Sequence, residues 1–502
     1  MTTIRRSIRN YVFRLVLLAL LGILSALAQQ ITGSVTGSVL DTSGAAVVGA
    51  KVTLTNIGTS ETQTAASDNS GNFRFLLLPP GTYTIECSLT EFKTFRREGI
   101  IVEADRSLAV PVTLSLDEAS QTVKVVGGTP LLEPNNSEVG TTVDSQKVLD
   151  LPLNARDPMG LANLAPTVKG VGYFGGEILT SWRIGSINIG GGQALRSAFL
   201  MDGVPNDKMG DASGPNPFLT TDSTGEFKVI TNGMSAEYGR TTGGVISVIS
   251  KSGTNDYHGT AFDYLQNTAL NADDFFSNEA GQKLAPVHQN QFGAAAGGHI
   301  AKNRVFFFAN FEGFDQHVSH SAILSSPTAL QGDGNFPQTT ISNTSSPIVT
   351  IYDPLTTNTS TNAREPFPGD IIPASRISQF SQEFFSLVPL PNLPGNSGTN
   401  DLYLIGATPT TRYTGGGKID WLISPTQRLS ARATQDYLTE SIPEASYFRN
   451  PLDTNNIDFV PRHSGFVSYT NTLSPSLVLD IRSGINRDYD QDFAMGQYPA
   501  VR

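Results

Sequence analysis

From residue 257 onward, the chain alternates candidate β-strands with connections that are by turns long and short. The candidate strands are 258–265, 291–300, 304–314, 411–423, 427–437, 463–473 and 476–487. Most of them are close to the roughly 9 to 11 residues that a tilted strand needs to cross a bilayer. The connections are 266–290, 301–303, 315–410, 424–426, 438–462 and 474–475. Long loops on one side and short turns on the other are typical of outer-membrane β-barrels, and a soluble sandwich has no reason to keep that parity.

The candidate strand at 411–423 has two chemically different faces. Alternate positions place Gly417, Ile419, Trp421 and Ile423 on one face and Gly416, Lys418, Asp420 and Leu422 on the other. The first face suits lipid and the second suits a water-filled lumen.

Aromatic residues gather in the candidate strand at 304–314. They are Phe306, Phe307, Phe308, Phe311 and Phe314, and we expect them to form an aromatic girdle at the membrane interface. The alternative is a buried apolar strand, which Asn310 and Glu312 on one face disfavour. The connection at 315–410 is rich in Ser, Thr, Asn and Pro, and we expect a long external loop with access to ligand.

The N-terminus combines a basic segment with an apolar run. Four arginines in residues 1–14 precede the uninterrupted apolar stretch 15–24. Residues 1–28 are therefore interpreted as a secretory signal peptide, with cleavage after Ala28. An uncleaved membrane anchor is the alternative, although the apolar run is shorter than the roughly 18 residues of a spanning helix. No later stretch is apolar enough for such a helix, so any further membrane insertion requires a β-barrel.

Composition narrows the function classes. Gly (48) and Pro (29) are abundant, which suits a turn-rich β protein. The formal charge is −11 and no long basic run is present, so nucleic acid is not expected as a partner. One cysteine and six scattered histidines lack the spacing of a zinc site, and we predict no metal and no cofactor. No nucleophile elbow or phosphate-binding loop is found, and the chain is not expected to be an enzyme.

Residues 31–116 predict a small β-sandwich of about seven strands, because short alternating runs recur between turn residues. Tyr83 and Cys87 fall on the same face of one run, which makes Cys87 a core residue and no nucleophile. Asp41 and Asp68 fit turns better than a calcium site.

The sandwich resembles the carboxypeptidase regulatory-like domain in two strings, VTGSVLDTSGAAVVGAKVTLTN and SDNSGNFRFLLLPPGTYTIECSLTEFKTFRREGI. The resemblance implies no peptidase, because the region contains no histidine for that zinc site. The family is grouped with carbohydrate-binding-like folds, which makes sugar binding an open alternative to a structural role. The region has no Trp, and Phe73, Phe75 and Tyr83 alternate as core residues do.

A linker at 117–128 follows the sandwich and contains a short β-prone run, Thr122, Val123, Lys124, Val125 and Val126. A segment of this kind can add to the edge of another sheet. It resembles the TonB box of TonB-dependent outer-membrane transporters, which a periplasmic partner protein grips by strand addition. The alternative is a plain linker.

Residues 129–256 carry the strings RSAFLMDGVPND and TGEFKVITNGMSAEYGRTTGGVISVISKSGTND, and the second continues as YHG into the first candidate barrel strand. In order and spacing these are similar to the plug and barrel entry of Oar-like TonB-dependent receptors. We expect Phe227, Val229 and the run 245–249 to be buried plug strands.

Several plug residues are candidates for structural roles. They are Asp202, Gly203, Glu237, Tyr238, Gly239, Arg240, Gly243 and Gly244. The glycines permit tight turns where larger side chains would collide. Glu237 and Arg240 are expected to pair with each other or with the barrel wall. Asp202, Asp207 and Asp211 match no calcium loop and are interpreted as solvated.

The resemblance implies a mainly β fold: a signal peptide, an Ig-like or prealbumin-like sandwich, a plug, and at 257–502 the first strands of an outer-membrane barrel. Such barrels have about 22 strands, whereas seven candidates are found here. The chain also ends in QYPAVR, without a terminal aromatic residue. We therefore expect an incomplete barrel, the N-terminal part of a longer protein.

The implied function is TonB-dependent import of an external ligand, either an oligosaccharide, a peptide or a metal chelate, across the outer membrane of a Gram-negative bacterium. The sandwich would be periplasmic, and the partners would be a TonB-type protein and membrane lipid. Ligand binding would release the segment 122–126 to that partner. The alternatives are an adhesion or surface-interaction protein, and a periplasmic binding module if the product is truncated.

Overall fold

The computed structural model describes most of the chain after the N-terminal segment. The described residues are 31–116, 122–126, 137–153, 156–169, 187–193, 196–207, 219–235, 238–239, 241–272, 275–279, 286–339, 349–393, 401–441, 456–474, 477–489 and 491–494. The predicted cleavage site at Ala28 and the residues Asp211, Glu237 and Arg240 lie outside them. A helix of the length and apolar character needed to cross a bilayer is not found among the described residues.

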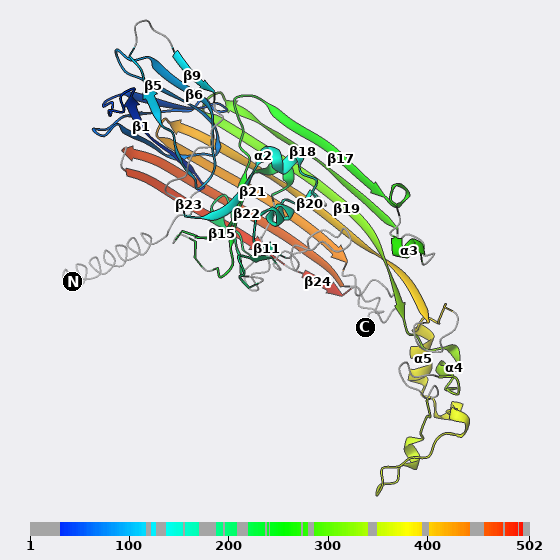
Figure 1. Cartoon of the computed structure of the whole chain (residues 1–502). Helices are drawn as coiled ribbons and strands as arrows, with labels where there is room; N and C mark the ends of the chain where they lie inside the picture. The colour runs from blue at the N-terminus through cyan, green and yellow to red at the C-terminus, as the bar shows by residue number, and fades with distance from the viewer. Residues whose placement is uncertain are drawn as a thin grey trace, which may run out of the picture.

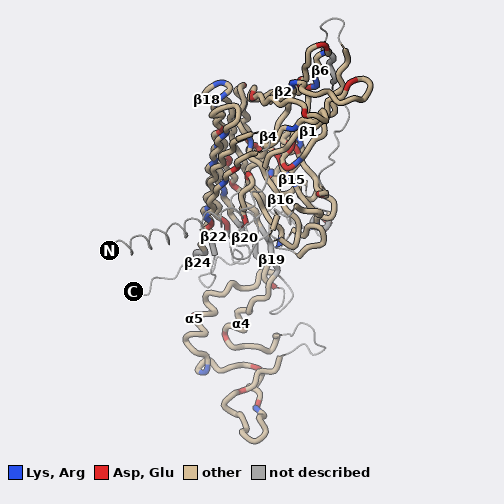
Figure 2. The backbone as a smooth tube through the Cα atoms, turned by 90° about the vertical axis from the view of Figure 1, so that its left-hand side faces the viewer, with Lys and Arg blue, Asp and Glu red and all other residues tan. Residues whose placement is uncertain are grey.

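Three β units follow one another along the chain (Figure 1). A small sandwich lies at one end of a long curved sheet, here called the wall, and a compact plug lies against one face of this sheet. The loop that contains α4 (Ala329–Gly332) and α5 (Gln379–Leu387) lies at the opposite end of the wall from the sandwich (Figure 2).

The sandwich consists of two sheets. Its strands are β1 (Gly33–Asp41), β2 (Lys51–Asn56), β3 (Thr62–Ala66), β4 (Asn72–Leu78), β5 (Gly81–Ser88), β6 (Thr94–Val102), β7 (Ser107–Ala109) and β8 (Val112–Leu114). One sheet has the order β4-β1-β7, with β8 also on β1, and the other begins β3-β2-β5-β6. The predicted sandwich is confirmed, with eight strands in place of about seven. Phe73, Phe75, Tyr83 and Cys87 are buried in its core, where burial raises the pKa of the Cys87 thiol to about 11.

The two aspartates of the sandwich are turn residues. Asp41 Oδ1 accepts hydrogen bonds from the backbone N–H groups of Ser43 and Ala45, at 2.8 and 2.9 Å. Asp68 Oδ1 does the same for Ser70 and Asn72, each at 2.8 Å. These local bonds explain both residues without a metal ion.

The segment predicted as a coupling strand is β9 (Thr122–Val126). It pairs in parallel with β6 and becomes the last strand of the second sandwich sheet, in the order β3-β2-β5-β6-β9.

The plug is built around a five-stranded sheet of order β10-β15-β16-β13-β14. Its elements are β10 (Val139–Asp144), α2 (Ser145–Asp150), η2 (Pro158–Leu164), β11 (Val168–Lys169), β12 (Asn188–Ile189), β13 (Ala198–Met201), β14 (Val204–Pro205), η4 (Thr221–Ser223), β15 (Thr224–Asn232) and β16 (Val245–Ser250). Phe227 and Val229 are buried between this sheet and the helical turns, as the sequence predicts.

The wall is an antiparallel sheet that does not close on itself over the described residues. Its strands are β17 (His258–Asn267), β18 (Val287–Ala301), β19 (Val305–Leu324), β20 (Leu402–Ser424), β21 (Gln427–Ser441), β22 (Asn456–Ser474), β23 (Leu477–Asp488) and β24 (Gln491–Ala494). Each of the seven predicted strands is present, and the short connections 302–304, 425–426 and 475–476 alternate with long ones. The two faces of β20 are as predicted, with Ile419 half-exposed and Lys418 buried.

The long connections contain short helices. These are η5 (Thr268–Leu270), α3 (Phe275–Glu279), η6 (Pro354–Thr356), η7 (Pro368–Asp370) and η8 (Ala374–Arg376), in addition to α4 and α5.

The predicted loop 315–410 is too long. β19 and β20 remain paired from Val305 with Trp421 up to Leu324 with Leu402, so the connection is 325–401. At about 3.3 Å per residue this ladder is roughly twice as long as the ~30 Å hydrocarbon core of a bilayer. The outer halves of these strands need no lipid-facing side chains, which is why their polar sequence looks like a loop.

The predicted aromatic girdle is wrong for three of its five residues. Phe306, Phe308 and Phe314 are buried on the face that meets the plug, whereas Phe311 is half-exposed on the opposite face. Successive strand residues point to opposite faces, so a run of phenylalanines cannot all reach lipid.

Candidate functional site at the interface between plug and wall

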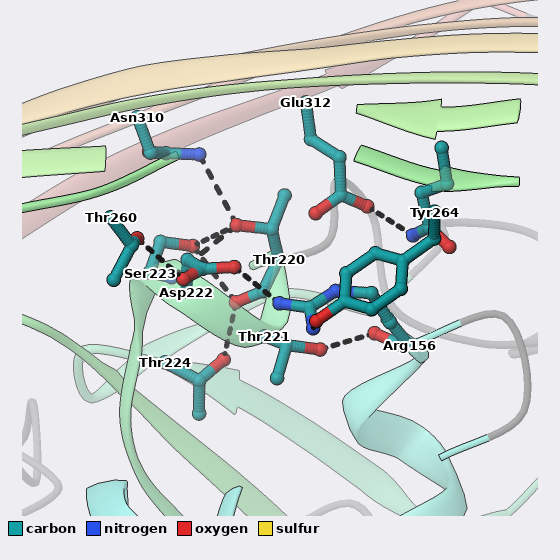
Figure 3. Close-up of polar contacts among 11 residues, drawn as sticks. Arg156, Thr220, Thr221, Asp222, Ser223, Thr224, Thr260, Tyr264, Asn310 and Glu312 are labelled. Atoms are coloured by element: carbon teal, nitrogen blue, oxygen red, sulfur yellow. Dashed lines mark hydrogen bonds and ion pairs between the residues drawn. The ribbon is translucent and has the colours of Figure 1, made fainter. Parts of the chain in front are cut away.

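Arg156 of the plug links a buried acidic turn to the first wall strand (Figure 3). Its guanidinium forms an ion pair with Asp222, which is buried in the turn at η4. The same guanidinium donates to the Tyr264 hydroxyl on β17 at 3.0 Å. Asp222 also accepts a hydrogen bond from the Thr260 hydroxyl on β17 at 2.7 Å. One plug carboxylate and one plug cation thus bind the same wall strand.

The Arg156 guanidinium is also stacked on aromatic rings of β17. It lies 4.3 Å from the centroid of Phe262 and 4.8 Å from that of Tyr264. Cation–π contacts of this kind are stronger when water is excluded. The two rings cover the face of the guanidinium, while its N–H groups bind Asp222 and the Tyr264 hydroxyl.

A small cavity lies beside this contact, where β18 and β19 face the plug. Its volume is about 30 Å³, and its lining includes Arg156, Thr220, Gln291 and Glu312. Gln291 donates to one Glu312 oxygen at 2.8 Å, and the other oxygen has no hydrogen-bond partner among the described residues. A cavity needs only about 10 to 15 Å³ to hold a water molecule. The arrangement therefore suits a hydrated seam between plug and wall.

Asp202 provides a second, deeper attachment. It has no exposed surface, and its carboxylate lies 2.9 Å from Arg432 Nη1 on β21 and 3.9 Å from Lys418 Nζ on β20. The same carboxylate accepts hydrogen bonds from the Ser250 backbone N–H and hydroxyl, each at 2.9 Å. Burial alone would raise the pKa of Asp202, but the two cations and Ser250 outweigh burial and lower that pKa.

The interpretation of Asp202 as solvated is therefore wrong. Asp202 (φ 49°) and Gly203 (φ 72°) form the turn between β13 and β14, a conformation that favours Asp-Gly. Asp-Gly is a common sequence in two-residue hairpin turns, but the partners of the carboxylate come from strands far along the chain. Asp207, in contrast, caps the start of β13 by accepting from the Phe199 backbone N–H at 2.7 Å.

A third buried group belongs to the wall itself. Asp436 on β21 is fully buried and accepts from Arg412 Nε at 2.7 Å and from the Thr414 hydroxyl at 2.6 Å. Arg462 on β22 lies 3.3 Å from the second Asp436 oxygen. These charges ring the inner surface of the wall at the level of the seam cavity, which Arg412 and Thr414 also line.

The sandwich contacts the plug through the residues that follow β6. The Ala104 backbone N–H donates to both oxygens of Glu226 on β15, each at 3.2 Å. Lys228 Nζ donates to Asp105 at 3.0 Å and to Glu138 at 3.1 Å. Burial raises the pKa of the Glu226 carboxyl to about 7.

The turn between β2 and β3 contacts the end of the wall that carries the short turns. Glu61 forms an ion pair with Arg428 on β21. Asn255, which precedes β17, donates from its backbone N–H to the Gly58 carbonyl at 2.9 Å and from its side chain to Asn303 at 2.7 Å. The sandwich is thus held both to the plug and to the rim of the wall.

The predicted plug glycines differ in their surroundings. An added Cβ at Gly244 would come within 2.2 Å of Ile189 Cγ2, and one at Gly243 within 2.8 Å of the Ser197 hydroxyl oxygen. An added Cβ at Gly239 would meet no atom of the described residues within 4 Å. Tyr238 donates to Asp105 of the sandwich at 2.8 Å.

Sequence reasoning missed Arg156, Asp222 and Arg432, which contribute most to the contact between plug and wall. The run of small polar residues at 220–224 resembles a plain exposed loop in the sequence, and only the structure shows that all five are buried. Within the described residues, no group of three or more His, Cys, Asp or Glu side chains is placed to hold a metal ion. The plug is thus attached to the wall by ion pairs and hydrogen bonds, which can be broken without breaking covalent bonds.

Comparison with known proteins agrees with this architecture. Residues 249–500, about half of the chain, match the family described as "Outer membrane beta barrel domain". The chain belongs to this outer-membrane β-barrel family. Residues 34–115 match the carboxypeptidase regulatory-like domain. The protein is accordingly an outer-membrane protein.

The protein is also a homologue of the TonB-dependent transporter Oar of Myxococcus xanthus, with 27% identity over 296 residues. The match covers 57% of this chain and 27% of that relative, so the chain spans about a quarter of the relative's length.

Solved structures of outer-membrane transporters and receptors are similar at low sequence identity. The outer-membrane transporter YddB from Escherichia coli is 12% identical with a TM-score of 0.44, covering 71% of this chain and 40% of that one. A mutant of the ferric enterobactin receptor PfeA from Pseudomonas aeruginosa is 13% identical with a TM-score of 0.40, covering 70% and 41%.

Proposed function

We propose that this protein is a TonB-dependent outer-membrane receptor that imports an external ligand, with the sandwich in the periplasm. The observation that carries the proposal is the plug, which contacts the inner face of the wall through buried ion pairs and hydrogen bonds. Asp202 with Arg432, and Arg156 with Asp222 and Tyr264, are the principal contacts. Contacts of this kind hold a body in place and can be replaced by water when the body is pulled.

The orientation follows from the connections. Short turns of outer-membrane barrels face the periplasm and long loops face outward. The sandwich contacts the short-turn rim at Asn255 and Arg428 through Gly58 and Glu61, and the loop 325–401 lies at the other end. An external ligand would meet the long loop first. A periplasmic partner would meet the sandwich and the segment Thr122–Val126.

In this mechanism, force applied at the segment Thr122–Val126 moves the plug relative to the wall. The seam cavity beside Glu312 offers a place where water enters as the polar contacts separate. Sugar binding by the sandwich is no part of the proposal, because Phe73, Phe75 and Tyr83 are buried and offer no platform.

The experiment is a deletion of residues 121–126 in cells that accumulate a fluorescent oligosaccharide, peptide or ferric chelate through this protein. We expect uptake to be lost while surface binding of the same probe is retained. A Gly-Ser replacement of equal length, which keeps the spacing between sandwich and plug, should behave like the deletion. Unchanged uptake in the deletion variant would contradict energy coupling through this segment.

Adhesion is the second candidate function. The outer loop exposes large apolar side chains, among them Leu355 at 77% and Phe380 on α5 at 76%. Apolar groups exposed at the end farthest from the sandwich suit contact with another surface. Cell contact that survives deletion of residues 121–126 but is lost with Phe380→Ser and Leu355→Ser would favour adhesion.

A further inference from the structure

The strand β9 pairs with a neighbouring strand along one edge, and no described strand pairs along its other edge. Its parallel partner is β6, with Thr94 opposite Thr122, Arg96 opposite Lys124 and Glu98 opposite Val126. β9 is the last strand of its sheet, and no described strand pairs with its other edge (Figure 1). An edge strand presents unpaired N–H and C=O groups that can template another strand.

Strand addition by a partner needs one edge only. Because β6 occupies the opposite edge, a partner strand can add to β9 without displacing it. The sandwich also holds the segment in the extended conformation that such a partner requires. Pre-ordering a segment removes part of the entropic cost of binding it.

β6 connects this edge directly to the plug. Its first half pairs with β9, and the residues after its end, Ala104 and Asp105, bind Glu226 and Lys228 on β15. A pull on the combined sheet therefore acts on the plug through these contacts.

We infer that the sandwich is the docking platform for the energy-coupling partner: an extended strand of that partner adds to the other edge of β9 while β9 stays paired with β6, and the pull reaches the plug through Ala104 and Asp105. This inference rests on the proposed function and adds how the coupling segment is presented. In this mechanism the segment 122–126 is not released from the sandwich. It stays paired with β6 and offers the other edge of β9 to the partner.

The test is a disulfide staple between β6 and β9. Arg96 and Lys124 are register partners on neighbouring parallel strands, and neighbouring strands lie about 4.8 Å apart, within the range that a disulfide spans. Cys87, the only native cysteine, is buried in the sandwich core and does not compete. The variant is Arg96→Cys with Lys124→Cys in the full-length protein, and Lys124→Cys alone is the matched control.

The probe is the purified periplasmic domain of the host's TonB protein, titrated against the receptor in detergent. We expect the oxidised staple to bind this domain as tightly as the unsubstituted protein or more tightly. A fall of roughly tenfold or more on oxidation, reversed by reduction, would overturn the inference and would leave TonB dependence standing. If the unsubstituted protein binds no TonB domain, the proposed coupling function fails, and this inference fails with it.

Hydrogen exchange on the unsubstituted protein provides a second test that needs no variant. Addition of the TonB domain should increase the protection of amides in residues 122–126 and leave those in residues 94–98 protected. Loss of protection at 94–98 would mean that the partner takes β9 away from β6, which would overturn the inference.

Discussion

The contact between sandwich and plug should weaken as pH rises, and Glu226→Gln should remove most of that dependence. Glu226 is 5% exposed and accepts the Ala104 N–H on both carboxylate oxygens. Burial, with a smaller contribution from Glu103, raises its pKa from 4.5 to about 7. When the sandwich separates from the plug, the carboxyl returns to water and to its ordinary pKa.

The sign follows from the direction of this shift. The docked state binds the proton more tightly, so its extra stability is complete below pH 4.5 and is lost as pH rises through about 7. A shift of roughly 2.5 units at 1.36 kcal/mol per unit corresponds to about 3 kcal/mol of docking free energy. Gln keeps an acceptor for the Ala104 N–H and carries no charge at any pH.

The assay is hydrogen exchange of the Ala104 segment in the unsubstituted protein and in Glu226→Gln, compared at equal pH so that intrinsic exchange cancels. At pH 8 the segment in the variant should be roughly 300-fold better protected, and at pH 5 the difference should fall to about fourfold. Glu61→Gln, which removes a carboxylate from the rim contact instead, should keep the pH slope. Equal slopes in Glu226→Gln and the unsubstituted protein, or docking that strengthens with pH, would refute the reasoning.

Two substitutions test the plug. Asp202→Asn leaves two buried wall cations uncompensated and should weaken the attachment of the plug to the wall by about 3 to 5 kcal/mol. The measurement is single-channel conductance in planar bilayers, which should rise in this variant and stay unchanged in the control Asp480→Asn, on a wall strand. A closed Asp202→Asn channel would contradict the assigned contact. Gly244→Ala places a Cβ within 2.2 Å of Ile189 and should destabilise the plug by about 1 to 3 kcal/mol in urea-dependent proteolysis. Gly239→Ala, where no described atom lies within 4 Å of the added Cβ, is the matched control, and equal proteolysis of both variants would count against the packing.

Local alternation was enough to predict the strands of the wall and of the sandwich. Exposed and buried side chains alternate along each strand, as Ile419 and Lys418 do, and this alternation can be recognised without knowing the distant partners of the strand. The outer ends of β19 and β20 were missed because strand residues beyond the bilayer carry no lipid-facing pattern. Phe306, Phe308 and Phe314 were misassigned because composition was given more weight than alternation.

The contacts between plug and wall were beyond sequence reasoning for a different reason. Asp202 is a turn residue by every local signal, and only the fold brings it to Arg432. Asp222 lies in a polar run that resembles a loop until the wall covers it. The ion-pair partners of these charged residues are far away in the sequence, and a single sequence does not show which residues pair.

The central claim is that the plug must move relative to the wall for ligand to pass, and a reversible lock tests it most directly. A Cβ built at Gly484 on β23 would lie 3.2 Å from the Val204 Cβ on the plug hairpin, close to the ~3.5 to 4.5 Å between Cβ atoms in a disulfide. In cells that carry Val204→Cys with Gly484→Cys, uptake should be lost when the pair is oxidised and restored by reductant, with surface binding of ligand retained throughout. Val204→Cys alone is the control. Uptake at the unlocked rate while the disulfide is intact would contradict the account.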